Sequence, residues 1–159
     1  MQRREFNQLL NTLLKPETIN DFCPNGLQVE GKDEIRTIVT GVTASQALID
    51  AAIENNADAI LVHHGYFWKG ESQPITGMKK RRVAALLAKD INLFAYHLPL
   101  DIHPEMGNNA QLAQLLDIEI EAGLEPTNNS VAMKGRLKTQ LTGSEFAKKI
   151  SQVLKREPL

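Results

Sequence analysis

Ala-Ile-Leu-Val-His-His-Gly, residues 59–65, is the stretch that decides the fold. Four apolar residues, two of them β-branched, run into two histidines and a glycine, a pattern typical of a buried parallel strand that ends at a site. Ligands of open α/β sheets bind beyond the carboxyl ends of the strands, which is where the histidines stand. Because adjacent strand residues point to opposite faces, both imidazoles reach one site only if the chain turns, and Gly65 permits that turn.

The composition is that of an ordinary globular protein of one domain, or of one domain and part of another. The 159 residues are 42% apolar and 23% charged, and the formal net charge is −1. This balance shows no basic footprint for nucleic acid or for an anionic membrane. The single basic block, Lys79 to Arg82, lies on a predicted helix and forms either a solvated face or a phosphate patch.

The cysteine count and the apolar runs bear on the compartment. Cys23 is the single cysteine, which excludes an internal disulfide, and the amino terminus lacks the apolar core of a signal peptide. No apolar run approaches the roughly 20 residues that a membrane span needs. A cytoplasmic protein without membrane contact is therefore expected.

Strands and helices are predicted to alternate through the middle of the chain. The predicted strands cover 35–42, 59–64 and 91–96, and the predicted helices cover 45–55 and 78–90. Such alternation favours right-handed crossovers and a parallel sheet. The predicted fold class is α/β, a three-layer lobe with helices on both faces of a parallel sheet.

Further elements are predicted on either side of this pattern. A helix over 6–14 is ended by Pro16, and turn residues make 21–31 a loop. Another helix runs to Leu116 from a cap at Asn108 or Asn109. The helical residues expected to face the core are Leu9, Leu10, Leu13, Leu14, Val83, Leu86, Leu87, Leu112, Leu115 and Leu116.

The last 30 or so residues are predicted to begin a second α/β lobe. A strand over 131–137 precedes a helix whose start carries a capping box, Thr142 with Glu145. Few later residues remain for these elements to pack against. The predicted domains are therefore 1–128, an α/β lobe that carries the site, and 129–159, the beginning of a second, incomplete lobe.

Candidate metal ligands follow two of the predicted strands. His63 and His64 end one strand, and His97 and Asp101 lie at and just past the end of the next. Imidazole nitrogen with carboxylate oxygen is a ligand set of Zn, Mn, Fe or Ni, and it excludes thiolate sites. The sequence therefore predicts a divalent-metal site. The alternative is that one or two of these histidines form hydrogen bonds in the core or at strand ends.

Other chemistries lack their motifs, since the sequence has no phosphate-binding loop, dinucleotide-binding glycine turn, nucleophile elbow or Cys-x-x-Cys pair. Cys23 has no nearby partner in the sequence and is interpreted as structural. His103 and Glu105 either supply an acid or base at the rim of the site or belong to the loop surface. Phe67 and Trp68 either anchor their loop to the core or form the wall of a pocket.

At these residues the sequence resembles the family of GTP cyclohydrolase 1 type 2 homologues, also called Ngg-one-interacting-factor-like or YbgI-like. The resemblance runs in register along the whole chain, and the combination of motifs is more specific than any one of them. The motifs are Pro-Asn-Gly-Leu-Gln-Val at 24–29, Leu-Val-His-His-Gly at 61–65 with Trp68 following, Tyr-His-Leu-Pro-Leu-Asp at 96–101 and Gly-Asn-Asn at 107–109.

The resemblance implies a two-lobed α/β protein that holds two divalent metal ions per full-length subunit, Zn, Mn, Fe or Ni, and assembles as a toroidal hexamer. By similarity, His64 and Asp101 hold one ion and His63 belongs to the other. The family's remaining ligands, a His and a Glu, lie in a second-half motif of the Gly-His-His type, and this sequence ends before that motif. The metal ligands predicted for this chain are therefore His63, His64 and Asp101.

Two hypotheses for function follow. The first is a metal-dependent hydrolase acting on a nucleotide-like or cyclic-amide substrate, because paired ions lower the pKa of a bridging water and polarise a phosphoryl or carbonyl oxygen. The cyclohydrolase part rests on the resemblance alone. The second is a metal-binding hexameric scaffold that recruits partners without catalysis. An open coordination position with an acid or base nearby separates the two.

Overall fold

The structure, a computed structural model, describes residues 1–127 and 129–158. It divides into two compact units, Met1–Pro99 and Leu100–Leu159. The domain boundary predicted after residue 128 falls on a residue outside the described part of the chain. The predicted domains 1–128 and 129–159 therefore stay a prediction.

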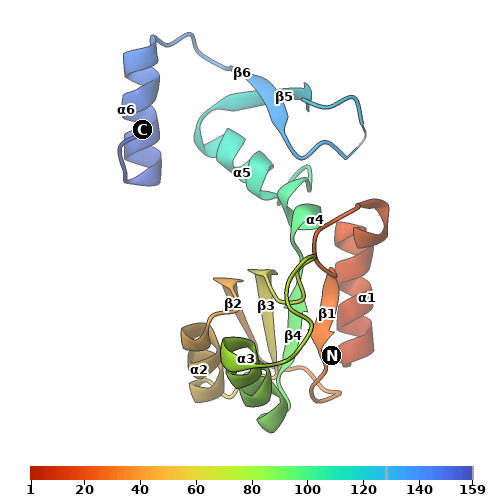
Figure 1. Cartoon of the computed structure of the whole chain (residues 1–159). Coiled ribbons are helices and arrows are strands. Elements are labelled where there is room, and N and C mark those ends of the chain that lie inside the picture. The colour runs from red at the N-terminus through yellow and green to blue at the C-terminus, as the bar shows by residue number, and fades with distance from the viewer. Residues whose placement is uncertain (128, 159) are drawn as a thin grey trace. The chain divides into compact units, whose positions relative to one another are not determined.

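The first unit is built on a sheet that has four strands in the described residues. The strands lie in the order β1 (Gly26–Val29), β4 (Asn92–Ala95), β3 (Ala59–His64) and β2 (Ile38–Thr43) (Figure 1). β2, β3 and β4 are parallel, which confirms the predicted α/β class. Because Val62 pairs with Ala95, the residues that follow β3 and β4 leave the sheet at the same edge.

β1 is an element that the sequence does not predict. The loop predicted over 21–31 is wrong at Gly26–Val29, which pairs antiparallel with β4. The turn signals are genuine, since Gly26 has a φ of 109° and the extended segment is only four residues long. Pairing with a strand far along the chain makes it extended, and such a contact leaves no local pattern.

Helices cover both faces of this sheet, as predicted (Figure 1). α1 (Arg3–Leu14) packs on one face, where the Phe6 ring meets the Phe94 ring edge-on with the ring centroids 5.0 Å apart. A short 3₁₀ helix (Pro16–Thr18) follows it. α2 (Gln46–Glu54) and α3 (Gly77–Ala88) place Ile49 and Leu86 in the main hydrophobic core on the other face. Ser45 caps α2 by accepting from the Leu48 amide.

The residues expected to face the core are confirmed in part. Those found buried are Leu10, Leu14, Val83, Leu86 and Leu116. Those found exposed are Leu9, Leu13, Leu87, Leu112 and Leu115. Each helix buries a narrower stripe than its apolar residues span, so half of these ten residues lie on the flanks of the stripe.

α4 (Leu98–Asp101) precedes the loop that leads to α5 (Asn108–Leu115). The predicted cap of α5 is wrong, because Gly107 occupies the cap position without a side-chain bond. The two asparagines donate elsewhere, Asn108 to Asp101 and Asn109 to the Val131 carbonyl.

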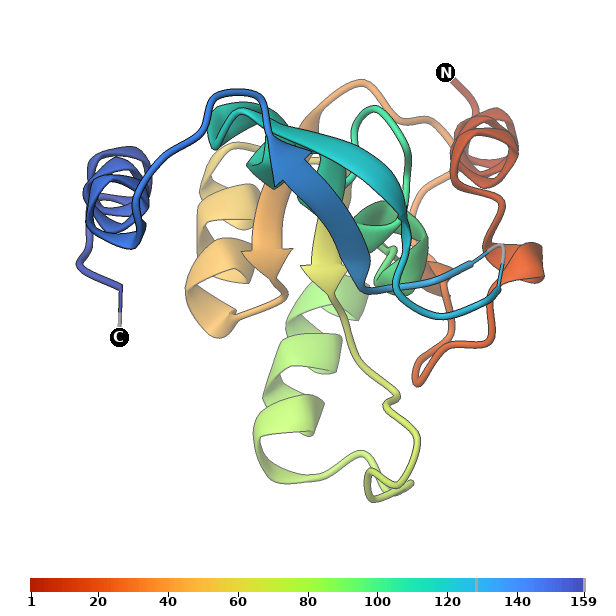
Figure 2. The same ribbon diagram turned by 90° about the horizontal axis from the view of Figure 1, so that it is seen from above.

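In the second unit β5 (Ile118–Gly123) pairs antiparallel with β6 (Met133–Leu137), and Figure 2 shows them as a ribbon. β5 is absent from the predicted elements, although apolar and acidic residues alternate over 118–121. α6 (Gly143–Leu154) begins at Thr142, and the predicted capping box with Glu145 is confirmed.

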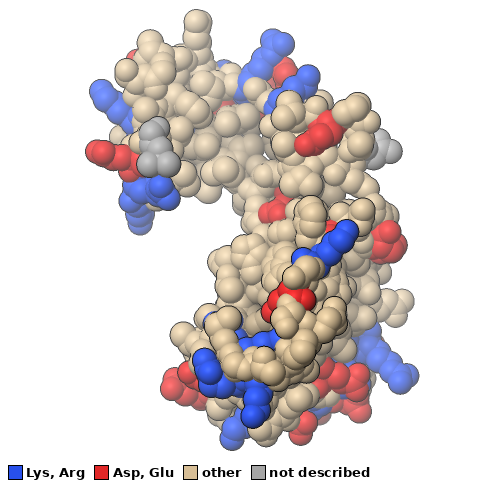
Figure 3. Space-filling view, in the orientation of Figure 1, with Lys and Arg blue, Asp and Glu red and all other residues tan. Residues whose placement is uncertain are grey.

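Acidic and basic side chains are interspersed on the face of the molecule drawn in Figure 3. In the basic block, Lys79 pairs with Glu71 at 3.3 Å and lies 5.3 Å from the centre of the Phe67 ring. Lys79 is thereby engaged within the fold, with its side chain only 10% exposed, which opposes a phosphate patch at this residue. Within residues 1–127 and 129–158, no helix combines the length and apolar character needed to cross a membrane.

A buried polar cluster closes the amino ends of β3 and β4. The Asp58 carboxylate accepts from the Arg36 and Thr37 amides, each at 2.8 Å, and pairs with the Lys32 ammonium at 2.7 Å. Burial of the Asp58 carboxyl opposes ionisation, but the Lys32 contact and the two amides outweigh it and lower the pKa from 3.8 to about 2. The ionised form of Asp58 therefore stabilises the fold.

We expect Asp58→Asn to remove part of the acid sensitivity of this protein. Because the folded-state pKa is depressed, the contribution of Asp58 is complete above pH 3.8 and is lost as the pH falls toward about 2. The substitution should lower the free energy of unfolding at neutral pH by about 1–2 kcal/mol. Urea unfolding between neutral and acidic pH measures both effects. A variant whose stability falls with acid as steeply as the parent's would contradict this role.

Candidate metal centre

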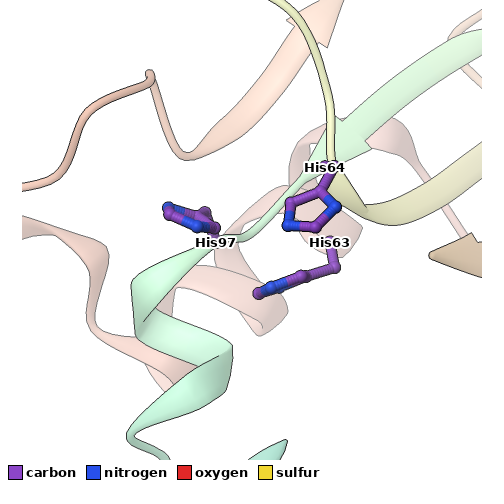
Figure 4. Close-up of side chains that lie close together, drawn as sticks. All are labelled: His63, His64 and His97. Atoms are coloured by element: carbon purple, nitrogen blue, oxygen red, sulfur yellow. The ribbon is translucent and has the colours of Figure 1, made fainter. Parts of the chain in front are cut away.

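Three imidazoles converge at the carboxyl edge of the parallel sheet. His63 and His64 are the last residues of β3, and His97 follows β4 by two residues (Figure 4). The ring centroid of His63 lies 4.4 Å from that of His64 and 5.1 Å from that of His97, and the His64 and His97 centroids are 5.6 Å apart. One nitrogen from each ring lies within 4.8 Å of the others, and all three side chains are half-buried.

Gly65 allows close packing at this edge of the sheet because it has no side chain. A Cβ at Gly65 would clash with Gln28 Oε1 and would lie 2.6 Å from the Ala95 Cβ. Gln28 Oε1 occupies that space because it accepts from the Tyr66 amide at 2.7 Å. The chain leaving His64 is thereby held against β1, which fixes where the imidazoles begin.

Hydrogen bonds to the protein orient the rings. His63 Nδ1 lies 3.1 Å from the Tyr96 carbonyl oxygen, which only accepts, so this nitrogen carries the proton. His97 Nδ1 lies 2.7 Å from Asp21 Oδ1, and His64 Nδ1 lies 3.3 Å from Thr43 Oγ1. In neutral His63 and His97 the lone pair is then on Nε2, the nitrogen that would bind an ion.

The chemistry of these donors fits a divalent metal. Three imidazole nitrogens suit Zn, Fe or Ni, and three protein ligands are the usual number in catalytic zinc sites, which keep a fourth position for water. Nitrogens bound to one tetrahedral zinc lie roughly 3.3 Å apart, as the bond length implies. Small ring movements would bring the three side chains from their present spacing to that distance.

Asp101, the predicted ligand that is not a histidine, belongs to the second compact unit. It ends α4, and its Oδ1 accepts from the Asn108 amide at 2.7 Å. Its role as a metal ligand stays a prediction. His103 accepts from the amides of Glu105 and Met106 through Nδ1, which shows that it shapes its own loop.

The sequence leaves Trp68 and Phe67 each as a loop anchor or as a wall of a pocket, and the structure gives them different roles. The Trp68 ring stands nearly perpendicular to the His97 ring, with the centroids 4.9 Å apart, and lies 5.9 Å from the His64 ring. Its Nε1 donates to the Gly65 carbonyl at 3.2 Å. Phe67 instead packs against the core beside Tyr66. Trp68 is therefore a wall of the histidine cluster, and Phe67 is an anchor.

Asp21 and Cys23 also lie near His97, and the sequence predicts neither as part of a site. One ligand atom from each of the three residues lies within 4.8 Å of the others. Burial, with the nearby Asp21 charge, raises the pKa of the Cys23 thiol to about 11, so at neutral pH it is protonated and a poor ligand. No sequence signal marks this proximity, because Asp21 and His97 are 76 residues apart.

Comparison with known proteins assigns the chain to a family. The family Duf34/NIF3 (NGG1p interacting factor 3) matches residues 1–159. A GTP cyclohydrolase 1 type 2 homolog from Haemophilus influenzae is 62% identical over 159 residues, and one from Vibrio cholerae is 61% identical. The alignments cover all of this chain and 63% of each relative, so the chain spans less than two thirds of their length.

Solved structures agree with this placement. A structure of the protein ybgI superposes with a TM-score of 0.94 and is 53% identical, over 100% of this chain and 63% of that chain. A protein from Thermus thermophilus superposes with a TM-score of 0.84 at 38% identity, over 100% of this chain and 64% of its own. The chain belongs to the Duf34/NIF3 family, as the resemblance in its sequence motifs led us to expect.

Proposed function

We propose that this chain carries the metal-binding part of a metal-dependent hydrolase acting on a nucleotide-like or cyclic-amide substrate. The observation that carries the proposal is the convergence of His63, His64 and His97 at one edge of the sheet. The name that the curated relatives carry, GTP cyclohydrolase 1 type 2 homolog, supports a substrate of this class.

In this proposal the three imidazoles hold a divalent ion through Nε2, and Asp101 is a further ligand. A bound ion would lower the pKa of a coordinated water to about 7, giving a hydroxide for attack on a carbonyl or phosphoryl centre. Trp68 limits access of solvent to His64 and His97 from its side. For a chain as long as the relatives, we propose two ions of Zn, Mn, Fe or Ni, a toroidal hexamer and a cytoplasmic location.

A metal-binding scaffold without catalysis is the second candidate function. Apolar side chains on β2 favour it, since Ile38 is 38% exposed and Val42 is 69% exposed in this chain. β2 is also an edge strand of the sheet. Exposed apolar side chains on an edge strand are suited to contact with another protein surface.

Metal content and hydrolysis separate the two functions. We expect the 159-residue chain to bind one zinc per chain, because its three clustered imidazoles form one coordination sphere. Elemental analysis after dialysis against zinc measures this. A chain extended to the length of its relatives should then hydrolyse members of a phosphodiester and cyclic-amide panel with Zn²⁺ or Mn²⁺. Full metal loading with no turnover on any substrate would favour the scaffold, and no bound zinc would overturn both.

A further inference from the structure

We propose that Asp21 and Asn25, on the loop before β1, are positioning residues that fix the orientation and tautomer of His97. They would do so by holding its ring and its backbone at once, which leaves the lone pair of the neutral ring on Nε2. The inference deepens the proposed metal site and rests on it for its purpose. It also gives a physical role to the loop that precedes β1, which the sequence pattern marks only as a turn.

The Asp21 carboxylate is buried and fully engaged. Its side chain is only 2% exposed. Oδ1 lies 2.7 Å from His97 Nδ1 and accepts from the Phe22 amide at 2.6 Å. Oδ2 accepts from the Leu98 amide at 2.9 Å and from the Asn25 side chain at 2.8 Å. These four contacts use the four lone-pair positions of a carboxylate, so Asp21 supports His97 and is not itself a metal ligand.

Asn25 completes the support from the backbone side. Its Oδ1 accepts from the His97 amide at 2.7 Å, while its Nδ2 donates to Asp21 Oδ2. These two bonds define which end of the amide is oxygen. The loop therefore accepts hydrogen bonds from the His97 ring and from the amides of residues 97 and 98. The imidazole cannot rotate without breaking its charged hydrogen bond to Asp21.

The competing interpretation is that Asp21, Cys23 and His97 bind a metal ion of their own. The hydrogen bonds of Asp21 oppose it. His97 Nδ1 already faces Asp21 Oδ1 at hydrogen-bond distance, and the other carboxylate positions accept from Phe22, Leu98 and Asn25. An ion there would have to displace the Nδ1 proton and these buried carboxylate contacts.

Asp21→Asn tests the positioning role because an amide has only one accepting end. If the new NH₂ group faces His97, Nδ1 must accept and the ring proton moves to Nε2, which then has no lone pair for a metal. If the NH₂ group faces Leu98 and Asn25 instead, it meets two donors. Either arrangement should weaken zinc binding by about 10–100-fold, the usual cost of losing the partner of a metal-binding histidine.

The experiment measures both the tautomer of His97 and the affinity of the protein for zinc. Nitrogen-15 NMR of the metal-free protein at mildly alkaline pH reports which His97 nitrogen carries the proton, and calorimetry with zinc reports affinity, for wild type, Asp21→Asn and Cys23→Ala. We expect an Nδ1 proton on His97 in the wild type and wild-type behaviour in Cys23→Ala. In Asp21→Asn we expect weaker zinc binding, with the ring proton on Nε2 where the new NH₂ group faces His97.

Each other outcome has a defined meaning. An Nε2 proton on His97 in the wild-type metal-free protein overturns the proposal, even if Asp21→Asn fails to fold. Loss of zinc binding in Cys23→Ala overturns it in favour of the separate Asp21–Cys23–His97 site. A wild-type protein that binds no zinc but shows the expected tautomers in wild type and Asp21→Asn defeats the proposed metal function and leaves the positioning role standing.

Discussion

Replacing His64 with alanine should weaken zinc binding by more than about 100-fold, because it removes one of three clustered imidazoles. Loss of a residue that only supports a metal ligand already lowers metal affinity by about 10–100-fold. The fold should survive. The His64 side chain is half-buried at the end of β3, beside the rings of His63, His97 and Trp68 and the hydroxyl of Thr43. We expect the free energy of unfolding of the metal-free protein to change by no more than about 1 kcal/mol.

His103→Ala is the matched control, since His103 is the fourth histidine of the sequence and accepts from two amides of its own loop. Zinc calorimetry and thermal unfolding of the metal-free variants provide the comparison, and His103→Ala should bind zinc as the wild type does. Asp101→Ala belongs in the same series as a test of the remaining predicted ligand. If His64→Ala bound zinc with undiminished affinity, the histidines would be hydrogen-bonding groups of the sheet edge, the alternative that the sequence leaves open.

The parts of the fold that the sequence predicts are those encoded by neighbouring residues. The run over 59–64 and the Thr142 capping box are both local patterns, and both appear in the structure as predicted. The meeting of His63 with His97 could also be predicted, because parallel strands end at the same edge of a sheet.

The parts that could not be predicted depend on contacts between distant segments. β1 is extended because it pairs with β4, and Asp21 reaches His97 across 76 residues of chain. Neither contact leaves a periodic signal at its own position. The exposure of Leu87 and Leu112 has the same origin, since an apolar stripe shows which residues are able to pack but not how wide a surface receives them.

Gly65→Ala should destabilise the protein and weaken its metal site together. The added methyl would clash with Gln28 Oε1 and would lie 2.6 Å from the Ala95 Cβ, and the second of these atoms belongs to a central strand that has no freedom to move aside. Overpacking of this kind, with loss of the Gln28 bond to the Tyr66 amide, should lower the free energy of unfolding by about 3 kcal/mol. Because Gly65 directly follows His64, relief of the clash would displace that imidazole, so zinc affinity should fall as well.

Gly143→Ala provides the matched control, because a Cβ at Gly143 meets nothing within 4 Å at the first position of α6. Alanine should be neutral there or stabilise the helix by up to about 1 kcal/mol. Urea unfolding and zinc calorimetry on both variants test the contrast. Adding Gln28→Ala to Gly65→Ala removes one of the two clashes, so the double variant should lose less stability than the sum of the single changes. A Gly65→Ala protein with wild-type stability and zinc affinity would show that β1 and β4 yield at no cost, and that the close approach at Gly65 does not position His64.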